Sequence, residues 1–299
     1  MAFNWKTFQT RTLTAIVFAA VMLIGLLWNQ WSFLILFSII HFGCWWEYLK
    51  LMEKIHQVRY DRYLKLGLML IGYGLMLWFY FWIYFMIGLS GWHQFLSLAT
   101  PFLGFILLLI GLKRKNISSK NFWNTALGLP YISLTLGLLM SLYFFGISDY
   151  QNHPPIPCDY CPAPNFFQFR WSIPIIIIFS LWINDTMAYI IGSIIGKTPL
   201  SKISPKKTWE GTIGGIVLSI GIASFAAWLI DFNIIKTVMT VAIVSIAGTF
   251  GDLLESKLKR MAGVKDSGNI MPGHGGFLDR FDSLLLAIPA VWLYVFLLM

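Results

Sequence analysis

Residues 272–299 read PGHGGFLDRFDSLLLAIPAVWLYVFLLM, so a polar, glycine-rich segment runs directly into an apolar one. The apolar part, 283–299, contains no charged residue. It is close to the roughly 20 residues that an α-helix needs to cross a bilayer. Similar apolar segments recur along the chain, and they decide its fold class.

The composition supports a membrane protein. Of 299 residues, 58% are hydrophobic and only 12% are charged, whereas soluble domains carry about 25% charged residues. The apolar runs are continuous, which argues against the alternating pattern of a membrane β-barrel. The sequence therefore predicts an all-α, polytopic integral membrane helical bundle that forms a single membrane domain over 1–299.

About nine spans fit the bilayer thickness. They are 12–28, 31–48, 66–88, 94–112, 124–146, 171–195, 211–230, 234–251 and 283–299. The first two are either a tilted hairpin or a partly interfacial pair. Residues 1–170 supply the N-terminal transmembrane helices, and 171–299 supply C-terminal helices with the main polar loops on the cytoplasmic side.

The distribution of Lys and Arg predicts the orientation. With the N-terminus in the cytoplasm and the C-terminus outside, every one of the 22 basic residues except Arg170 and Lys236 falls on the inner side, as the positive-inside rule requires. This pattern is typical of a multi-pass protein of the cell inner (cytoplasmic) membrane. Basic inner loops meet anionic headgroups, so the net charge of +9 needs no nucleic acid partner.

The long outer loop 147–170 contains a lone Cys-x-x-Cys pair, Cys158 and Cys161. A disulfide on an oxidising side, two unpaired thiols, or a functional pair are all compatible with this pattern. A metal site would need further ligands, and only His153 is near in sequence.

Asp185 lies inside an otherwise apolar span, in SLWINDTMAYIIG. A carboxylate at membrane depth is costly and usually faces a polar cavity or a partner. Either it makes a structural hydrogen bond, for example with Asn184 or Thr186, or it belongs to a functional site.

The segment 196–211, GKTPLSKISPKKTWEG, predicts an anion site. Ser204 and Pro205 resemble an N-cap followed by proline at the first helical position. Lys206 and Lys207 would then lie in the first turn, where positive side chains are disfavoured unless an anion is bound. A nucleotide phosphate and a lipid headgroup would both satisfy this pattern, as would simple anchoring at the inner face.

Helical spacing in 251–282 places acidic residues together. Four polar residues fall at i, i+3, i+4 and i+7 on one helix face: Asp252, Glu255, Ser256 and Lys259. Asp279 and Asp282 are likewise i and i+3 at the start of the last span. The stretch between is rich in glycine, which permits close backbone approach. Carboxylates beside clustered basic residues suit Mg²⁺ bound to phosphates, so the residues predict a metal-dependent enzyme acting on phosphates at the inner interface.

These polar segments resemble those of a known family, the phosphatidate cytidylyltransferases or CDP-diacylglycerol synthases. The resemblance is carried by Ser256–Arg260, Lys265-Asp266, Pro272–Gly276 and Asp279–Asp282, with two further blocks at Asn184–Tyr189 and Ser204–Gly211. It implies an all-α homodimer that transfers the cytidylyl group of CTP to phosphatidic acid, giving CDP-diacylglycerol and pyrophosphate. It also implies Mg²⁺ as cofactor, with a monovalent cation such as K⁺ as a candidate second ion.

The resemblance and the chemistry together predict roles for the site residues. Asp252 and Asp279 would bind the metal, with Asp282 in or next to its ligand shell. The groups that would act on the phosphates are Lys206, Lys207, Lys259, Arg260, Lys265, His274 and Arg280. Substrate contacts would come from Asp185, Ser204, Thr208, Glu210, Ser256, Asp266, Gly275 and Gly276. His274 could equally make a structural hydrogen bond, and Asp266 either contacts the ribose or orients a Lys.

Two rival functions remain. A CTP-using polyprenol or phytol kinase would transfer a terminal phosphate to a hydroxyl and would want a base near the acceptor. A cation-coupled transporter would fit Asp185 within a span, but the spans show no obvious inverted repeat.

Overall fold

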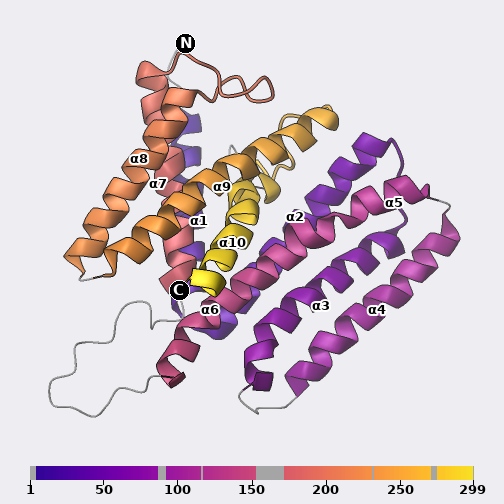
Figure 1. Cartoon of the computed structure of the whole chain (residues 1–299). Helices are drawn as coiled ribbons and strands as arrows, with labels where there is room; N and C mark the ends of the chain where they lie inside the picture. The colour runs from indigo at the N-terminus through magenta and orange to yellow at the C-terminus, as the bar shows by residue number, and fades with distance from the viewer. Residues whose placement is uncertain are drawn as a thin grey trace. The chain divides into compact units, whose positions relative to one another are not determined.

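The computed structural model describes residues 5–86, 92–115, 117–152, 172–230, 232–270 and 275–298. Apart from isolated bridge residues, among them the pair Pro199 and Thr208, the regular structure in these ranges is helical (Figure 1). The all-α prediction is therefore confirmed. Cys158, Cys161 and His153, singled out in the sequence, lie outside the described residues.

The described residues form ten α-helices and one π-helix. In chain order they are α1 (Trp5–Leu27), α2 (Gln30–His56), α3 (Arg62–Met86), α4 (Trp92–Arg114), α5 (Ser119–Ala126), the π-helical η1 (Leu129–Leu134), α6 (Thr135–Asn152), α7 (Ser172–Ile195), α8 (Trp209–Leu229), α9 (Ile234–Met261) and α10 (Leu278–Leu298).

In the described ranges, eight helical segments are long and apolar enough to cross a membrane. They lie in α2, α3, α4, the continuous Ser119–Phe144 stretch, α7, α8, α9 and α10. The remaining predicted span, 12–28, coincides with α1, whose apolar stretch Thr12–Leu27 is shorter. The prediction of a polytopic helical bundle is confirmed, while the orientation of the termini stays a prediction.

Several helices extend well beyond the predicted apolar spans. α9 continues to Met261 instead of ending near 251, and α10 begins at Leu278 instead of 283. Hydropathy marks only the apolar part of a helix, whereas backbone hydrogen bonding continues into the polar turns. These extra turns matter because they carry the charged residues of the site.

The chain forms two compact units. Unit 1 comprises Met1–Gly137 and Glu255–Asp282, and unit 2 comprises Leu138–Leu254 and Ser283–Met299. Because the divisions fall inside α6, α9 and α10, each of these three helices contributes to both units.

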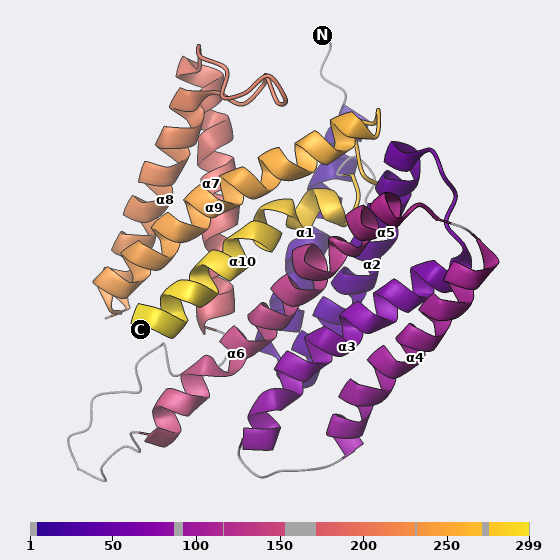
Figure 2. The same cartoon turned by 45° about the vertical axis from the view of Figure 1, so that its right-hand side comes forward.

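In unit 1, α3 and α4 lie side by side along much of their length (Figures 1 and 2). A Cβ added to Gly67 would come within 2.6 Å of the backbone nitrogen of Leu108, and one on Gly104 within 2.7 Å of that of Ile71. Only glycine fits at such a crossing, and small residues of this kind commonly bring membrane helices together.

Buried hydrogen bonds hold α2 in unit 1. The Oγ of Ser133, on η1, accepts a hydrogen bond from Trp45 Nε1 at 2.8 Å and lies 3.0 Å from His41 Nε2. The Tyr48 hydroxyl donates to the Asn124 carbonyl at 2.9 Å. The turn of α2 that carries Glu47 is thus fixed by α5 and η1.

In unit 2, α7 and α8 pack closely through small residues. A Cβ on Gly211 would lie 2.7 Å from the carbonyl oxygen of Ala188, and one on Gly215 would lie 2.8 Å from that of Asn184. This close approach brings the polar turn of α7 that contains Asp185 beside the start of α8.

Candidate functional site

The connection between α7 and α8 is a closed loop. The carboxylate of Glu210 accepts hydrogen bonds from the backbone nitrogens of Lys197 and Thr198, each at 3.2 Å. The Thr198 carbonyl in turn accepts from Trp209 N at 2.9 Å, and the Lys207 carbonyl accepts from Leu200 N at 2.7 Å. Glu210, in the first turn of α8, therefore ties the beginning of the loop to its end. The lysines of this loop belong to the predicted anion site.

The predicted start of this helix is wrong. α8 begins at Trp209, and its N-cap is Thr208, whose hydroxyl accepts from Gly211 N at 3.1 Å. Ser204 instead opens a turn, because its carbonyl accepts from Lys207 N at 3.1 Å. Ser followed by Pro suits the first two positions of a β-turn as well as a helix start, and here the turn forms. The lysines therefore lie in a loop.

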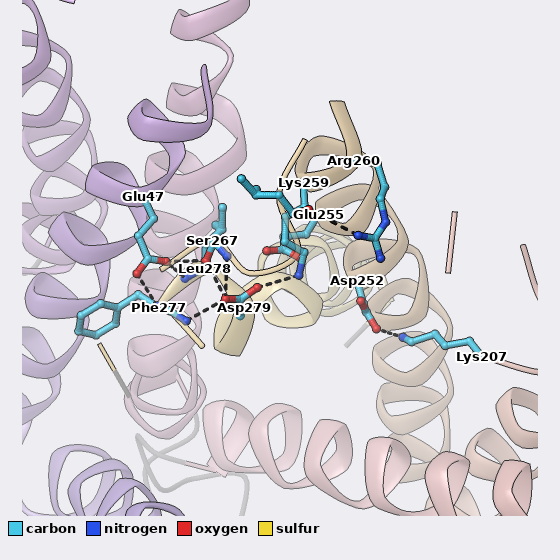
Figure 3. A network of polar contacts seen from close by, with 12 residues as sticks. Glu47, Lys207, Asp252, Glu255, Lys259, Arg260, Ser267, Phe277, Leu278 and Asp279 are labelled. Atoms are coloured by element: carbon cyan, nitrogen blue, oxygen red, sulfur yellow. Dashed lines mark hydrogen bonds and ion pairs between the residues drawn. The ribbon is translucent and has the colours of Figure 1, made fainter. Parts of the chain in front are cut away.

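The loop, α7, α8 and α9 line a cavity of about 460 Å³ within unit 2. Its lining includes the predicted site residues Asp185 of α7, Asp252 of α9, and four from the loop and the cap of α8, namely Ser204, Lys206, Lys207 and Thr208. Lys207 forms an ion pair with Asp252 (Figure 3). A cavity of this size suits a small-molecule ligand, and its paired Lys and Asp provide both the cation and the carboxylate that a phosphate–metal ligand needs.

In unit 1, the carboxylate of Asp279 is surrounded by donors at the start of α10. Its Oδ2 accepts from Gly276 N at 2.8 Å, from Ser267 N at 2.9 Å and from Ser267 Oγ at 3.0 Å. Its Oδ1 accepts from Lys259 Nζ at 2.7 Å. Asp279 thus ties the polar segment between α9 and α10 to both helices (Figure 3).

Lys259 bridges two acidic side chains. It pairs with Asp279 and also with Glu255, one turn earlier on α9. The Glu255 side chain is fully buried, and the Lys259 side chain is only 13% exposed. A buried charge needs a compensating partner, so the three side chains stabilise one another. The predicted role of Lys259 at a phosphate would require this arrangement to open.

Glu47 extends the same cluster from α2. Its carboxylate accepts hydrogen bonds from Ser267 Oγ at 2.7 Å, Leu278 N at 2.8 Å and Phe277 N at 3.0 Å. A Cβ on Gly268 or on Gly276 would collide with this carboxylate. Gly275 has a φ of 82°, a backbone conformation that side chains other than glycine rarely adopt. The glycines of the predicted motif therefore make room for Glu47 and Asp279.

The acidic residues of this region fit a divalent cation. One carboxylate oxygen of Glu255 and one of Asp282 lie within 4.8 Å of each other, and both side chains are buried. Among the described residues, Oε1 of Glu255 is a buried oxygen without a hydrogen-bond partner. Asp252 precedes Glu255 by three residues on α9, so a helix face leads from one carboxylate to the next.

The other predicted site residues are less enclosed. Arg260, Lys265, Asp266 and Arg280 are exposed, while Ser256 is half-buried on α9. The guanidinium of Arg260 contacts the Val264 carbonyl at 3.5 Å. His274 lies outside the described residues, so its role at a phosphate stays a prediction.

Sequence reasoning did not assign roles to Glu47 and Glu255. Glu255 appeared on the right helix face but without a metal role. The signal for Glu47 is its place at the end of the apolar run 31–48, where an acidic side chain is costly. Its partners, however, lie 220 and more residues later in the chain, beyond the reach of any local pattern.

Comparison with known proteins identifies the family. A model described as the Cytidylyltransferase family matches residues 9–298, nearly the whole chain. The chain belongs to this family. The family resemblance inferred from the motifs is thereby confirmed.

Three relatives share a shorter stretch. The chain is 49% identical over 112 residues to a phosphatidate cytidylyltransferase of Staphylococcus haemolyticus, a match that covers 36% of this chain and 43% of the relative. It is 41% identical over 138 residues to that of a Synechocystis species, covering 46% and 47%. For the Aquifex aeolicus protein, the identity is 43% over 120 residues, covering 40% and 45%. The chain therefore matches less than half the length of each of these relatives.

Proposed function

We propose that this protein transfers the cytidylyl group of CTP to phosphatidic acid, giving CDP-diacylglycerol and pyrophosphate in phospholipid biosynthesis. The observation that carries the proposal is the cavity in unit 2, where Lys206, Lys207 and Asp252 line a space of ligand size. Membership of the Cytidylyltransferase family and the three relatives, each a phosphatidate cytidylyltransferase, support the same reaction.

The chemistry suits these residues. A phosphate oxygen of phosphatidic acid attacks the α-phosphorus of CTP and forms a new P–O bond. The bond between the α-phosphorus and the oxygen that bridges it to the β-phosphorus breaks, and pyrophosphate leaves. The phosphate monoester is already anionic, so the reaction needs positioning and charge neutralisation more than a strong base. Lys206 and Lys207 would neutralise phosphate oxygens in the cavity, and Thr208 and Ser204 would donate hydrogen bonds to them.

Mg²⁺ fits the carboxylates. Bound there, it would neutralise developing charge on the phosphates. Within unit 1, Asp279 and Asp282 are its proposed ligands, and the buried, unpartnered Oε1 of Glu255 adds a third candidate. Asp252, which belongs to unit 2, stays a fourth candidate predicted from the sequence. Mg²⁺ typically takes one or two carboxylates and completes its coordination with phosphates and waters, so not all four need bind at once.

The remaining parts of the proposal rest on the resemblance and on the charge distribution. We place the active site at the cytoplasmic face of the inner membrane, where most basic residues lie when the N-terminus is inside. A K⁺ ion as second cation and a homodimer stay predictions.

The proposal is tested on the purified protein in detergent with phosphatidic acid, Mg²⁺ and CTP labelled with ³²P at either the α or the γ phosphate. Label from the α position should enter the lipid, while γ label should leave as pyrophosphate. Chelation with EDTA should abolish transfer, and added MgCl₂ should restore it.

Two outcomes would contradict the proposal. Entry of γ label into a polyprenol offered in place of phosphatidic acid would establish a kinase. Absence of transfer from both positions, in protein that retains its helical circular dichroism, would remove the enzymatic function and favour a transporter.

A further inference from the structure

Glu47 connects α2 to the segment between α9 and α10, within unit 1. Its side chain is buried, with 1% exposure. A carboxylate inside an apolar helix is costly unless it is paired or hydrogen-bonded. Both of its oxygens meet donors, because Oε1 accepts from Phe277 N, and Oε2 accepts from Leu278 N and Ser267 Oγ (Figure 3).

Two of these donors form the N-terminus of α10. Leu278 is its first residue, and Phe277, which precedes it, has no side-chain oxygen that could cap the helix. The first N–H groups of a helix lack intrahelical acceptors, and the helix dipole favours an anion there. Glu47 provides this cap from a helix that is distant in sequence. Asp279 follows Leu278 directly in this first turn of α10.

The third donor, Ser267, connects Glu47 to Asp279. The Ser267 hydroxyl has one proton, and its oxygen lies 2.7 Å from Glu47 and 3.0 Å from Asp279. Asp279 has three other donors, namely Ser267 N, Gly276 N and Lys259 Nζ. The Ser267 hydroxyl therefore donates mainly to Glu47, while Ser267 N donates to Asp279, so Ser267 connects the two carboxylates.

We infer that Glu47 is a positioning residue for the proposed reaction. From α2 it holds Ser267 and the start of α10 in place, and thereby orients Asp279 and its partner Lys259. Glu47 acts through these groups and contacts no substrate itself. The kinetic consequence rests on the proposed cytidylyl transfer, whereas the ordering of the segment does not.

Three variants test this role. Glu47→Gln replaces one acceptor oxygen by an amide NH₂, which cannot accept from the N–H of Phe277 or Leu278. Glu47→Asp keeps the charge but shortens the side chain by one methylene. Glu53→Gln is the matched control, because Glu53 lies on the same helix but binds Tyr60 N and Lys65, each at 2.7 Å.

Two measurements are made on each full-length variant in detergent. Steady-state kinetics give kcat and the KM for CTP and phosphatidic acid, and mass spectrometry follows trypsin cleavage after the exposed Lys265. Glu47→Gln should lower kcat by about 10- to 100-fold, the usual effect of losing an outer partner of a metal-binding group, with little change in either KM. Trypsin should also cleave this variant after Lys265 faster than it cleaves the wild type. Glu47→Asp should recover part of kcat, and Glu53→Gln should match the wild type.

Wild-type kcat and wild-type cleavage in Glu47→Gln would overturn the inference. A loss of kcat without faster cleavage would do the same, since it would indicate an effect other than positioning. If Glu47→Gln fails to fold, Glu47→Asp and Ser267→Ala decide, and wild-type kcat in both would refute the role. If the wild-type protein transfers no cytidylyl group, the proposed function fails, and the cleavage comparison alone decides whether Glu47 orders the segment.

Discussion

Replacing Lys259 by Met should destabilise the protein strongly, because Lys259 is the charge partner of two enclosed carboxylates. Its side chain is 13% exposed, that of Asp279 is 8% exposed and that of Glu255 is fully buried. Removing one partner of a buried ion pair typically costs about 3–5 kcal/mol. Asp279 keeps donors from Ser267 and Gly276, whereas Glu255 loses its ion-pair partner. The lower end, about 3 kcal/mol, is therefore expected.

The free energy of unfolding is measured by tryptophan fluorescence during titration with SDS in mixed micelles. Lys257→Met is the control, since Lys257 is exposed on the same helix and surface substitutions usually change stability by less than about 0.5 kcal/mol. Added MgCl₂ should stabilise Lys259→Met more than the wild type, because a divalent cation can replace the lost positive charge. Equal stability of the two Met variants would refute the reasoning that these carboxylates depend on Lys259.

Three further predictions concern the glycines and the unit 2 loop. Gly276→Ala should lower both stability, by about 1–3 kcal/mol from overpacking, and transfer activity, because its Cβ would collide with Glu47. Gly221→Ala, where no atom lies within 4 Å of the added Cβ, should leave stability unchanged in the same SDS unfolding titration. Lys207→Ala should reduce kcat/KM for CTP by about 10- to 100-fold, the effect of losing a hydrogen bond to a charged group. Lys202→Ala, outside the cavity lining, should match the wild type in the same kinetics. Glu210→Gln should speed trypsin cleavage at Lys202 several-fold, because the carboxylate that binds Lys197 N and Thr198 N is lost. An unchanged rate would show that the backbone hydrogen bonds alone keep the loop closed.

Local patterns predicted the parts of the site that depend on neighbours in sequence. The helical period placed Asp252, Glu255 and Lys259 on one face, and α9 has that register. The same kind of reasoning failed at Ser204, because Ser-Pro suits both a helix start and a turn. Thr208 gained the cap because the loop returns to it through hydrogen bonds of Thr198 and Lys207.

The sequence by itself determined the membrane class, the approximate spans and the family, because these depend on composition, on period and on a motif that is continuous along the chain. Only the tertiary structure decided which charges meet. Enclosed carboxylates require donors, and packing selects those donors from any part of the chain. That is why Glu47 meets the start of α10, and why Lys259, predicted to neutralise phosphates, pairs with Glu255 and Asp279.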